Sequence, residues 1–125
     1  MGEALTIEVR RGRGVAIVTV AGEIDIATVT RLRERLLEVA ASGRPLVADL
    51  DRVGFIDSAG LSALVGAAKR AAASGGSLQV VCARPRTRQL LRLTGLDRRI
   101  PLARTLDEAL AALAAVRTAN PPASR

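Results

Sequence analysis

Hydrophobic and polar positions alternate over the first twenty residues, a pattern typical of strands with one buried face. Residues 5–10 read L-T-I-E-V-R, and residues 15–20 continue with the β-branched run V-A-I-V-T-V. Residues 11–14 between them read R-G-R-G, and the two glycines favour a tight turn. The pattern therefore predicts a hairpin or a pair of neighbouring strands over residues 5–20.

Farther along the chain, apolar residues recur at spacings of three and four, which is typical of amphipathic helices. Four helices are expected to start at residues 28, 58, 86 and 106. A glycine follows the expected C-terminal end of each of the first three, at positions 43, 75 and 95. We expect Gly43 to take a left-handed conformation at the end of its helix, and Thr105 to cap the last one. The expected buried stripes are Val29, Leu32, Leu36, Val39 and Ala40 in the first helix and Leu61, Leu64, Val65, Ala68 and Ala72 in the second.

Three more strands are expected between these helices, over residues 45–50, 77–82 and 100–102. Strands that alternate with helices indicate an α/β fold with right-handed crossovers. We therefore predict a single domain over residues 1–117, with a mainly parallel central sheet of four to five strands packed with about four helices. Residues 118–125 are expected to form a disordered tail.

The composition excludes several kinds of chemistry. The 125 residues include no histidine, a single cysteine at position 82 and a single aromatic residue at position 55. Nucleophilic triads that need an imidazole base, zinc sites of histidine and cysteine, disulfides and base-stacking platforms are therefore excluded. We expect no catalytic residue, no metal and no cofactor.

The charge of the chain is strongly positive, with 19 Lys and Arg against 12 Asp and Glu. Seven arginines lie between positions 84 and 104, opposed only by Asp97. They form either a solvated helix face or a surface for an anionic partner; direct nucleic-acid binding is not expected, because no aromatic residue lies among them. Without a membrane-spanning run or a signal peptide, we expect a cytoplasmic protein that does not associate with membranes.

The stretch most able to carry function lies where the third strand leads into the second helix, at Asp57 and Ser58. We expect the apolar strand to end and the chain to turn before it reaches Asp57. A serine at a helix N-cap accepts a hydrogen bond from a free backbone N–H, and this structural role alone would explain Ser58. A phosphoryl group at the same position would be favoured by the helix dipole, so Ser58 is also a candidate switch.

Residues 49–61, which read D-L-D-R-V-G-F-I-D-S-A-G-L, resemble the signature of STAS domains, specifically of bacterial anti-sigma factor antagonists. The resemblance extends over residues 5–117 and includes the segments 22–25, 73–78 and 93–97. It implies a regulatory protein rather than an enzyme. Several matching segments in the same order make the resemblance specific.

The resemblance implies a partner-switching circuit. The unphosphorylated antagonist binds an anti-sigma factor that is also a serine kinase, and so frees the sigma factor. The kinase phosphorylates Ser58 and breaks the complex, and a serine phosphatase restores it. The resemblance places partner-binding residues at Asp25, Asp57, Ser58, Ala59 and Gly60, with glycine at position 60 allowing another backbone to approach.

Three other functions compete with this hypothesis. A STAS subunit of a transport or stress complex would bind its partner without phosphorylation. A small hydrolase that used Ser58 with Asp57 would lack a general base, since the only lysine, Lys69, lies about three helical turns away. A nucleic-acid binder driven by the arginines would show a steep dependence on salt.

Overall fold

The computed structural model describes residues 5–119, and side chains up to residue 115. Strands β1 (Thr6–Gly12) and β2 (Val15–Ile24) pair antiparallel, with Gly12 opposite Val15. The two residues of the turn, Arg13 and Gly14, both have positive φ, as a two-residue turn between twisted strands requires. The predicted hairpin is therefore confirmed.

The remaining strands lie in chain order beside the hairpin. The sheet order is β1-β2-β3-β4-β5, and all pairs from β2 to β5 are parallel. This arrangement confirms the predicted α/β architecture with its mainly parallel sheet and four helices. The added elements are β3 (Pro45–Ile56), β4 (Ser77–Val81), β5 (Leu102–Ala103), α1 (Val29–Ala40), α2 (Ser58–Ala73), α3 (Pro85–Leu93), α4 (Leu106–Ala119) and the 3₁₀ turn η1 (Leu96–Arg98).

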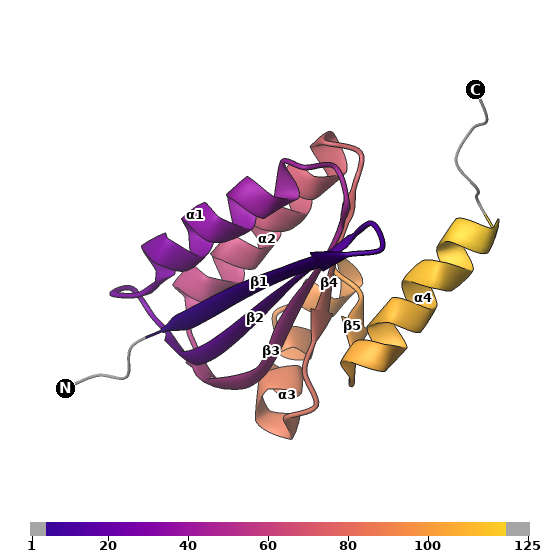
Figure 1. Ribbon diagram of the computed structural model, residues 1–125. Coiled ribbons are helices and arrows are strands. Elements are labelled where there is room, and N and C mark those ends of the chain that lie inside the picture. Colours follow the sequence, from indigo (N-terminus) through magenta and orange to yellow (C-terminus); the bar gives the residue numbers. More distant parts are fainter. Residues whose placement is uncertain (1–4, 120–125) are drawn as a thin grey trace.

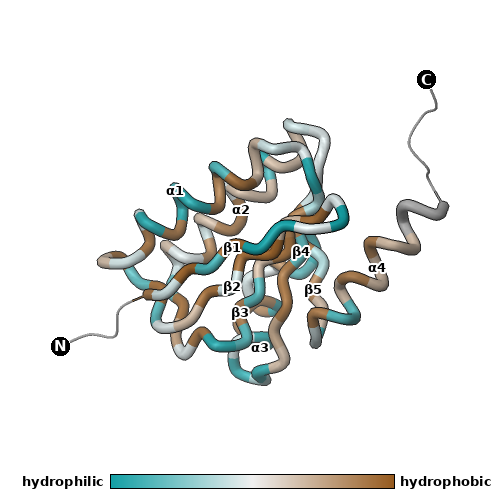
Figure 2. Tube along the Cα trace, viewed as in Figure 1, coloured by the Kyte–Doolittle hydropathy of each residue, from teal (hydrophilic) through white to brown (hydrophobic). Residues whose placement is uncertain are grey.

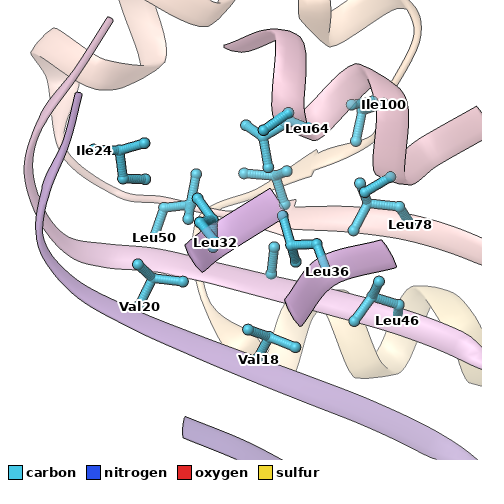
Figure 3. Packing of buried hydrophobic residues seen from close by; sticks show 14 of the residues in the cluster. Val18, Val20, Ile24, Leu32, Leu36, Leu46, Leu50, Leu64, Leu78 and Ile100 are labelled. Carbon is cyan, nitrogen blue, oxygen red and sulfur yellow. The ribbon is translucent and has the colours of Figure 1, made fainter. Parts of the chain in front are cut away.

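Helices cover both faces of the sheet, and each face has its own core. Because the strand order follows the chain, successive right-handed crossovers place α1, α2 and α3 on one face. Figure 1 shows α1 and α2 side by side there, and α4 on the opposite side. The larger core cluster joins β2, β3 and β4 to α1 and α2 (Figure 3), with Leu91 of α3 in the same cluster. The smaller cluster lies under α4 and consists of Val15, Val47, Val81, Ala103, Ala109 and Leu113.

The observed elements correct several details of the predictions. Strand β3 continues to Ile56, six residues past the expected end, because it keeps pairing with β2 through two register shifts. Helix α2 buries small residues, Gly60, Ala63, Ala67 and Ala71, together with Leu64. Ala72 of the expected stripe is exposed, and Leu61, Val65 and Ala68 are only half-buried.

The first and last helices follow their predictions closely. The five residues expected to be buried in α1 are all buried. Thr105 caps α4, because its Oγ1 accepts a hydrogen bond of 3.1 Å from the N–H of Glu108. Helix α4 reaches Ala119, so residues 118 and 119 of the expected tail are helical, and residues 120–125 lie outside the described part. No helix in residues 5–119 is long and apolar enough to cross a bilayer.

The loops that follow α1 and α2 pack against each other through glycines. Gly43 has φ +78°, as expected, although α1 itself ends three residues earlier. A Cβ at Gly43 would lie 2.5 Å from the carbonyl oxygen of Ser74, and one at Gly76 would lie 2.6 Å from that of Arg44. Gly75 also has positive φ, at +88°, but faces open space. These contacts determine how closely the loop that precedes β3 and the loop that precedes β4 approach each other.

Replacing Gly43 by alanine is expected to destabilise the fold more than the same change at Gly75. Both variants force alanine into a left-handed conformation, which costs about 1–2 kcal/mol. At Gly43 the added methyl group also meets backbone, which adds about 1–3 kcal/mol of overpacking. Urea denaturation of both variants measures the difference, and equal free energies of unfolding would contradict the close approach of the two loops.

Candidate functional site

The candidate site lies where β2 and β3 end together. Ile24 and Ile56 are register partners in the parallel pair, and each is followed directly by an aspartate. The N–H of Asp57 donates a hydrogen bond of 3.2 Å to the carbonyl of Ile24, which continues the pairing by one residue. The edge of the sheet therefore holds Asp25 and Asp57 close together, although 32 positions separate them in the sequence.

Asp57, not Ser58, is the N-cap of α2. Its Oδ1 accepts hydrogen bonds from the N–H groups of Ala59, at 3.0 Å, and Gly60, at 3.2 Å. Ser58 is the first residue inside the helix, and its side chain is exposed. The expectation that Ser58 caps the helix is therefore wrong, because the carboxylate of Asp57, directly after β3, accepts these N–H groups and Ser58 is already helical.

Because Asp57 caps the helix, the Ser58 hydroxyl takes no part in the hydrogen bonds at the N-terminus of α2. Within residues 5–115 its Oγ has no hydrogen-bond partner, whereas the Asp57 carboxylate is occupied by two backbone donors. Both of these donors bind Oδ1 of Asp57, and no hydrogen bond joins this carboxylate to the Ser58 hydroxyl. The geometry thus offers an accessible hydroxyl without an assembled nucleophile.

Gly60 fixes the position of the helix start. It is buried, and a Cβ on it would lie 2.6 Å from side-chain atoms of both Ile24 and Ile56. The close approach that glycine permits here is to the protein's own strand ends. Gly60 therefore positions Ser58 rather than presenting a surface, while Ala59 beside it is half-buried.

Asp25 organises the loop that leads into α1. Its Oδ1 accepts hydrogen bonds from the N–H groups of Ala27, at 2.9 Å, and Thr28, at 3.1 Å. The Thr28 hydroxyl in turn donates to the carbonyl of Glu23 at 2.8 Å. Asp25 therefore shapes the turn that precedes α1, whose first residue is Val29, and does not itself begin the helix.

The same end of the two strands exposes large apolar side chains that the hydrophobic pattern of the sequence did not indicate. Phe55, the only aromatic residue, is 50% exposed, and Ile26 is 83% exposed. Phe55 lines a depression of about 530 Å³ with Leu90 and Leu93 of α3, and Arg86 borders it. The pairing of Phe55 with Glu23 follows a register shift, so simple alternation along β3 did not predict its exposure.

The arginine segment divides into two groups. Arg84 donates through Nε to the carbonyl of Asp51 at 2.8 Å, and Arg88 donates to the carbonyl of Cys82 at 2.8 Å. These two side chains hold the loops around β4. The other five are exposed and form no ion pair within residues 5–115: Arg86, Arg92, Arg98, Arg99 and Arg104.

The single cysteine is shielded from solvent. Cys82 is buried, and desolvation raises the pKa of its thiol, so the thiolate is disfavoured. In the described part of the chain, no group of three or more acidic or cysteine side chains is placed to hold a metal ion. The described residues thus offer an exposed serine at a strand end that also exposes large apolar side chains.

Comparisons with known proteins find relatives of this chain and of its fold. Residues 6–109 match the STAS domain family. The chain is 36% identical over 109 residues to the anti-sigma-F factor antagonist RsfB of Mycobacterium tuberculosis, covering 86% of this chain and 88% of that protein. It is 35% identical over 92 residues to the anti-sigma-B factor antagonist of Bacillus subtilis, covering 74% and 84%. The crystal structure of an anti-sigma factor antagonist from Mycobacterium paratuberculosis aligns with a TM-score of 0.81 at 38% identity, over 90% of this chain and 97% of that one.

The different roles of Asp57 and Ser58 are testable by stability. Asp57→Ala removes the acceptor of two N–H groups and is expected to lower the free energy of unfolding by about 0.5–2 kcal/mol. Ser58→Ala is expected to change it by less than about 0.5 kcal/mol, as for an exposed surface position. Thermal or urea unfolding of both variants decides the assignment. A larger loss of unfolding free energy in Ser58→Ala than in Asp57→Ala would show that Ser58 caps the helix.

Proposed function

The chain belongs to the STAS domain family, as its residues 49–61 predicted, and we propose that it is an anti-sigma factor antagonist switched by phosphorylation of Ser58. The names of the two curated relatives, which match over most of their length, support the role as an anti-sigma factor antagonist. The proposal that Ser58 is the switch rests on its exposed hydroxyl, which holds no hydrogen bond within residues 5–115 and lies three positions after the exposed Phe55.

In the proposed circuit, the unphosphorylated protein binds an anti-sigma factor that has serine kinase activity, and the sigma factor is released. The kinase then transfers a phosphoryl group from ATP to the Ser58 oxygen, which loses its proton, and ADP leaves. A serine phosphatase hydrolyses the phosphoserine and restores binding. The protein itself acts as a binding module and not as an enzyme.

The local structure suggests why phosphorylation would release a partner. Phosphate adds about −1.5 to −2 charges beside the Asp57 carboxylate, which already occupies the N–H groups of Ala59 and Gly60. In the free protein, the positive end of the helix dipole stabilises the added phosphate charge by about 0.3–1 kcal/mol and so offsets part of its repulsion by Asp57. In a closed interface the charge would be desolvated without a pairing cation, which costs several kcal/mol, so the loss at the interface exceeds the local gain.

The exposed apolar side chains near Asp25 and Asp57 offer a partner an apolar contact surface. Large exposed apolar side chains on a soluble protein often mark an interaction site, and aromatic residues are frequent among energetically dominant contacts. Phe55 and Ile26 each lie two positions or fewer from Asp57 or Asp25. We propose that these side chains and Leu93 form the apolar part of the surface that the anti-sigma factor covers, with Ser58 at its border.

The switch is tested by incubating the protein with candidate anti-sigma kinases and ATP and mapping phosphate by mass spectrometry. One phosphate on Ser58 is expected, and none on Ser58→Ala. In calorimetry, Ser58→Asp should bind the kinase at least tenfold more weakly than wild type, about 1.4 kcal/mol, while remaining folded. Ser58→Ala should stay bound in the presence of ATP.

Ser77→Asp is the matched control, because Ser77 is exposed and begins β4 at the opposite end of the sheet. It should bind like wild type. Phosphate on Thr28, Thr87 or Thr105 instead of Ser58 would refute the site. Tight partner binding with no phosphate on any residue would favour a STAS interaction subunit that is not phosphorylated.

Arg86 tests whether the basic segment contributes to the partner surface. It borders the Phe55 depression and is exposed, whereas Arg88 is held by backbone carbonyls and is unsuited to such a test. Arg86→Glu should slow association with the anti-sigma factor, most strongly at low ionic strength. Arg44→Glu, an exposed arginine that precedes β3 at the other end of the sheet, should not. Equal association rates for the two variants would identify the segment as a solvated face.

A further inference from the structure

We propose that the groove between the β1–β2 hairpin and α4 binds the chain of a free fatty acid or a similar single-chain amphipathic anion. This site is separate from the Ser58 edge, and the inference does not depend on the proposed function. It follows from the shape of the groove, its apolar floor and the sign of the charge around it.

The groove exists because α4 covers only part of its face of the sheet. The helix packs mainly against β3, β4 and β5, and it covers β2 at Val15 and Ile17, so much of the outer side of β1 and β2 is left uncovered. Val15 and Ile17 of β2 form the floor, and Leu110, Leu113 and Ala114 of α4 form one wall of a cavity of about 560 Å³. The hydrophilic end of the hairpin lies on the same side of the molecule as α4 (Figure 2).

The rim of the groove is positively charged. Arg10, Arg11 and Arg13 line it together with Gly12, and no acidic residue of the described part of the chain does. Arg10 and Arg11 are exposed and form no ion pair with a residue in the range 5–115. A guanidinium group is the preferred partner of a carboxylate, which it can bind through two parallel hydrogen bonds. An apolar floor under a cationic rim is complementary to an anion that carries an apolar chain.

The dimensions favour a small ligand over a helix of another protein. Cavities for small ligands range over about 300–1,000 Å³ and are lined mainly by apolar side chains with a few polar groups. Leu110 and Leu113 lie within one helical turn, about 5 Å along the axis, and Val15 and Ile17 span about 7 Å of strand. A docked amphipathic helix needs anchors over two turns or more, which this floor does not supply.

Two occupants from this protein itself are disfavoured by charge. A second copy placed rim to rim would bring arginines against arginines on chains that each carry a net charge of +7. Residues 120–125 carry no acidic side chain, and their only charged side chain is another arginine. The complementary charge is therefore expected from another molecule.

The groove and Ser58 lie at opposite ends of β2. The groove is lined by Val15, the first residue of the strand, whereas the Ser58 edge begins at Ile24, its last residue. Nine residue steps of extended chain separate the two by about 30 Å. A ligand in the groove would therefore leave the phosphorylation surface uncovered.

Binding is measured with the full chain and 11-dansylaminoundecanoate, whose fluorescence reports transfer from water to an apolar site. Saturable binding is expected, with displacement by dodecanoate below its micellar concentration. Dodecanol, which lacks the charge, and octanoate, which lacks four methylenes, should each displace the probe at least tenfold more weakly. Equal potency of dodecanoate and dodecanol, or the absence of saturable binding, would overturn the proposal.

Matched variants locate the site. The double variant Arg10→Ala/Arg11→Ala should weaken dodecanoate binding at least tenfold, whereas Arg98→Ala/Arg99→Ala, with the same loss of charge, should not. Leu110→Gln should weaken it similarly and Leu93→Gln should not. Equal effects within either pair would show nonspecific attraction and overturn the site.

Two further measurements separate ligand binding in the groove from the partner switch and from attraction to a membrane surface. Ser58→Asp should bind dodecanoate like wild type, so failure of the partner switch and failure of the groove are distinguishable. Vesicles of phosphatidylglycerol are tested in parallel by sedimentation. Sedimentation with vesicles in the absence of binding to free dodecanoate would identify a membrane surface and overturn the proposal.

Discussion

The fit of Gly60 against Ile24 and Ile56 is the contact on which the arrangement of the functional edge depends. These isoleucines end two neighbouring parallel strands, and the helix that follows the second strand starts directly above them. A side chain at position 60 would meet both, so the helix can approach the strand ends this closely only with glycine there. The bond from the Asp57 N–H to the Ile24 carbonyl holds the same junction from the backbone side.

Once this junction is formed, the first turn of α2 separates the residues that hold the fold from the residue proposed as the switch. Asp57 supplies the oxygen that caps the helix, and Gly60 supplies the close packing. Ser58 lies between them and has neither task, so its side chain can be modified without removing a contact that holds the fold. A charge added there would act mainly on whatever covers the surface, which is the property that a reversible switch requires.

The two ends of the sheet differ in character. The carboxyl ends of β2 and β3 carry acidic residues, a serine and exposed apolar side chains. The hairpin at the amino end of β2 carries arginines above an apolar groove. Because β2 runs the length of the sheet, one strand connects two surfaces that differ in charge and lie too far apart to be covered by the same small ligand.

Local sequence was enough to predict the α/β order, the hairpin, the buried stripe of α1, the Thr105 cap and the family, because each depends on local periodicity or on a contiguous motif. It did not determine that Asp57 rather than Ser58 caps α2. Both residues suit that position, and the choice depends on how far β3 continues to pair with β2. The meeting of Asp25 with Asp57, the inward role of Gly60, the exposure of Phe55 and the groove under the hairpin depend on strand register and helix placement. Contacts between residues far apart in the chain fix these, and no local pattern encodes them.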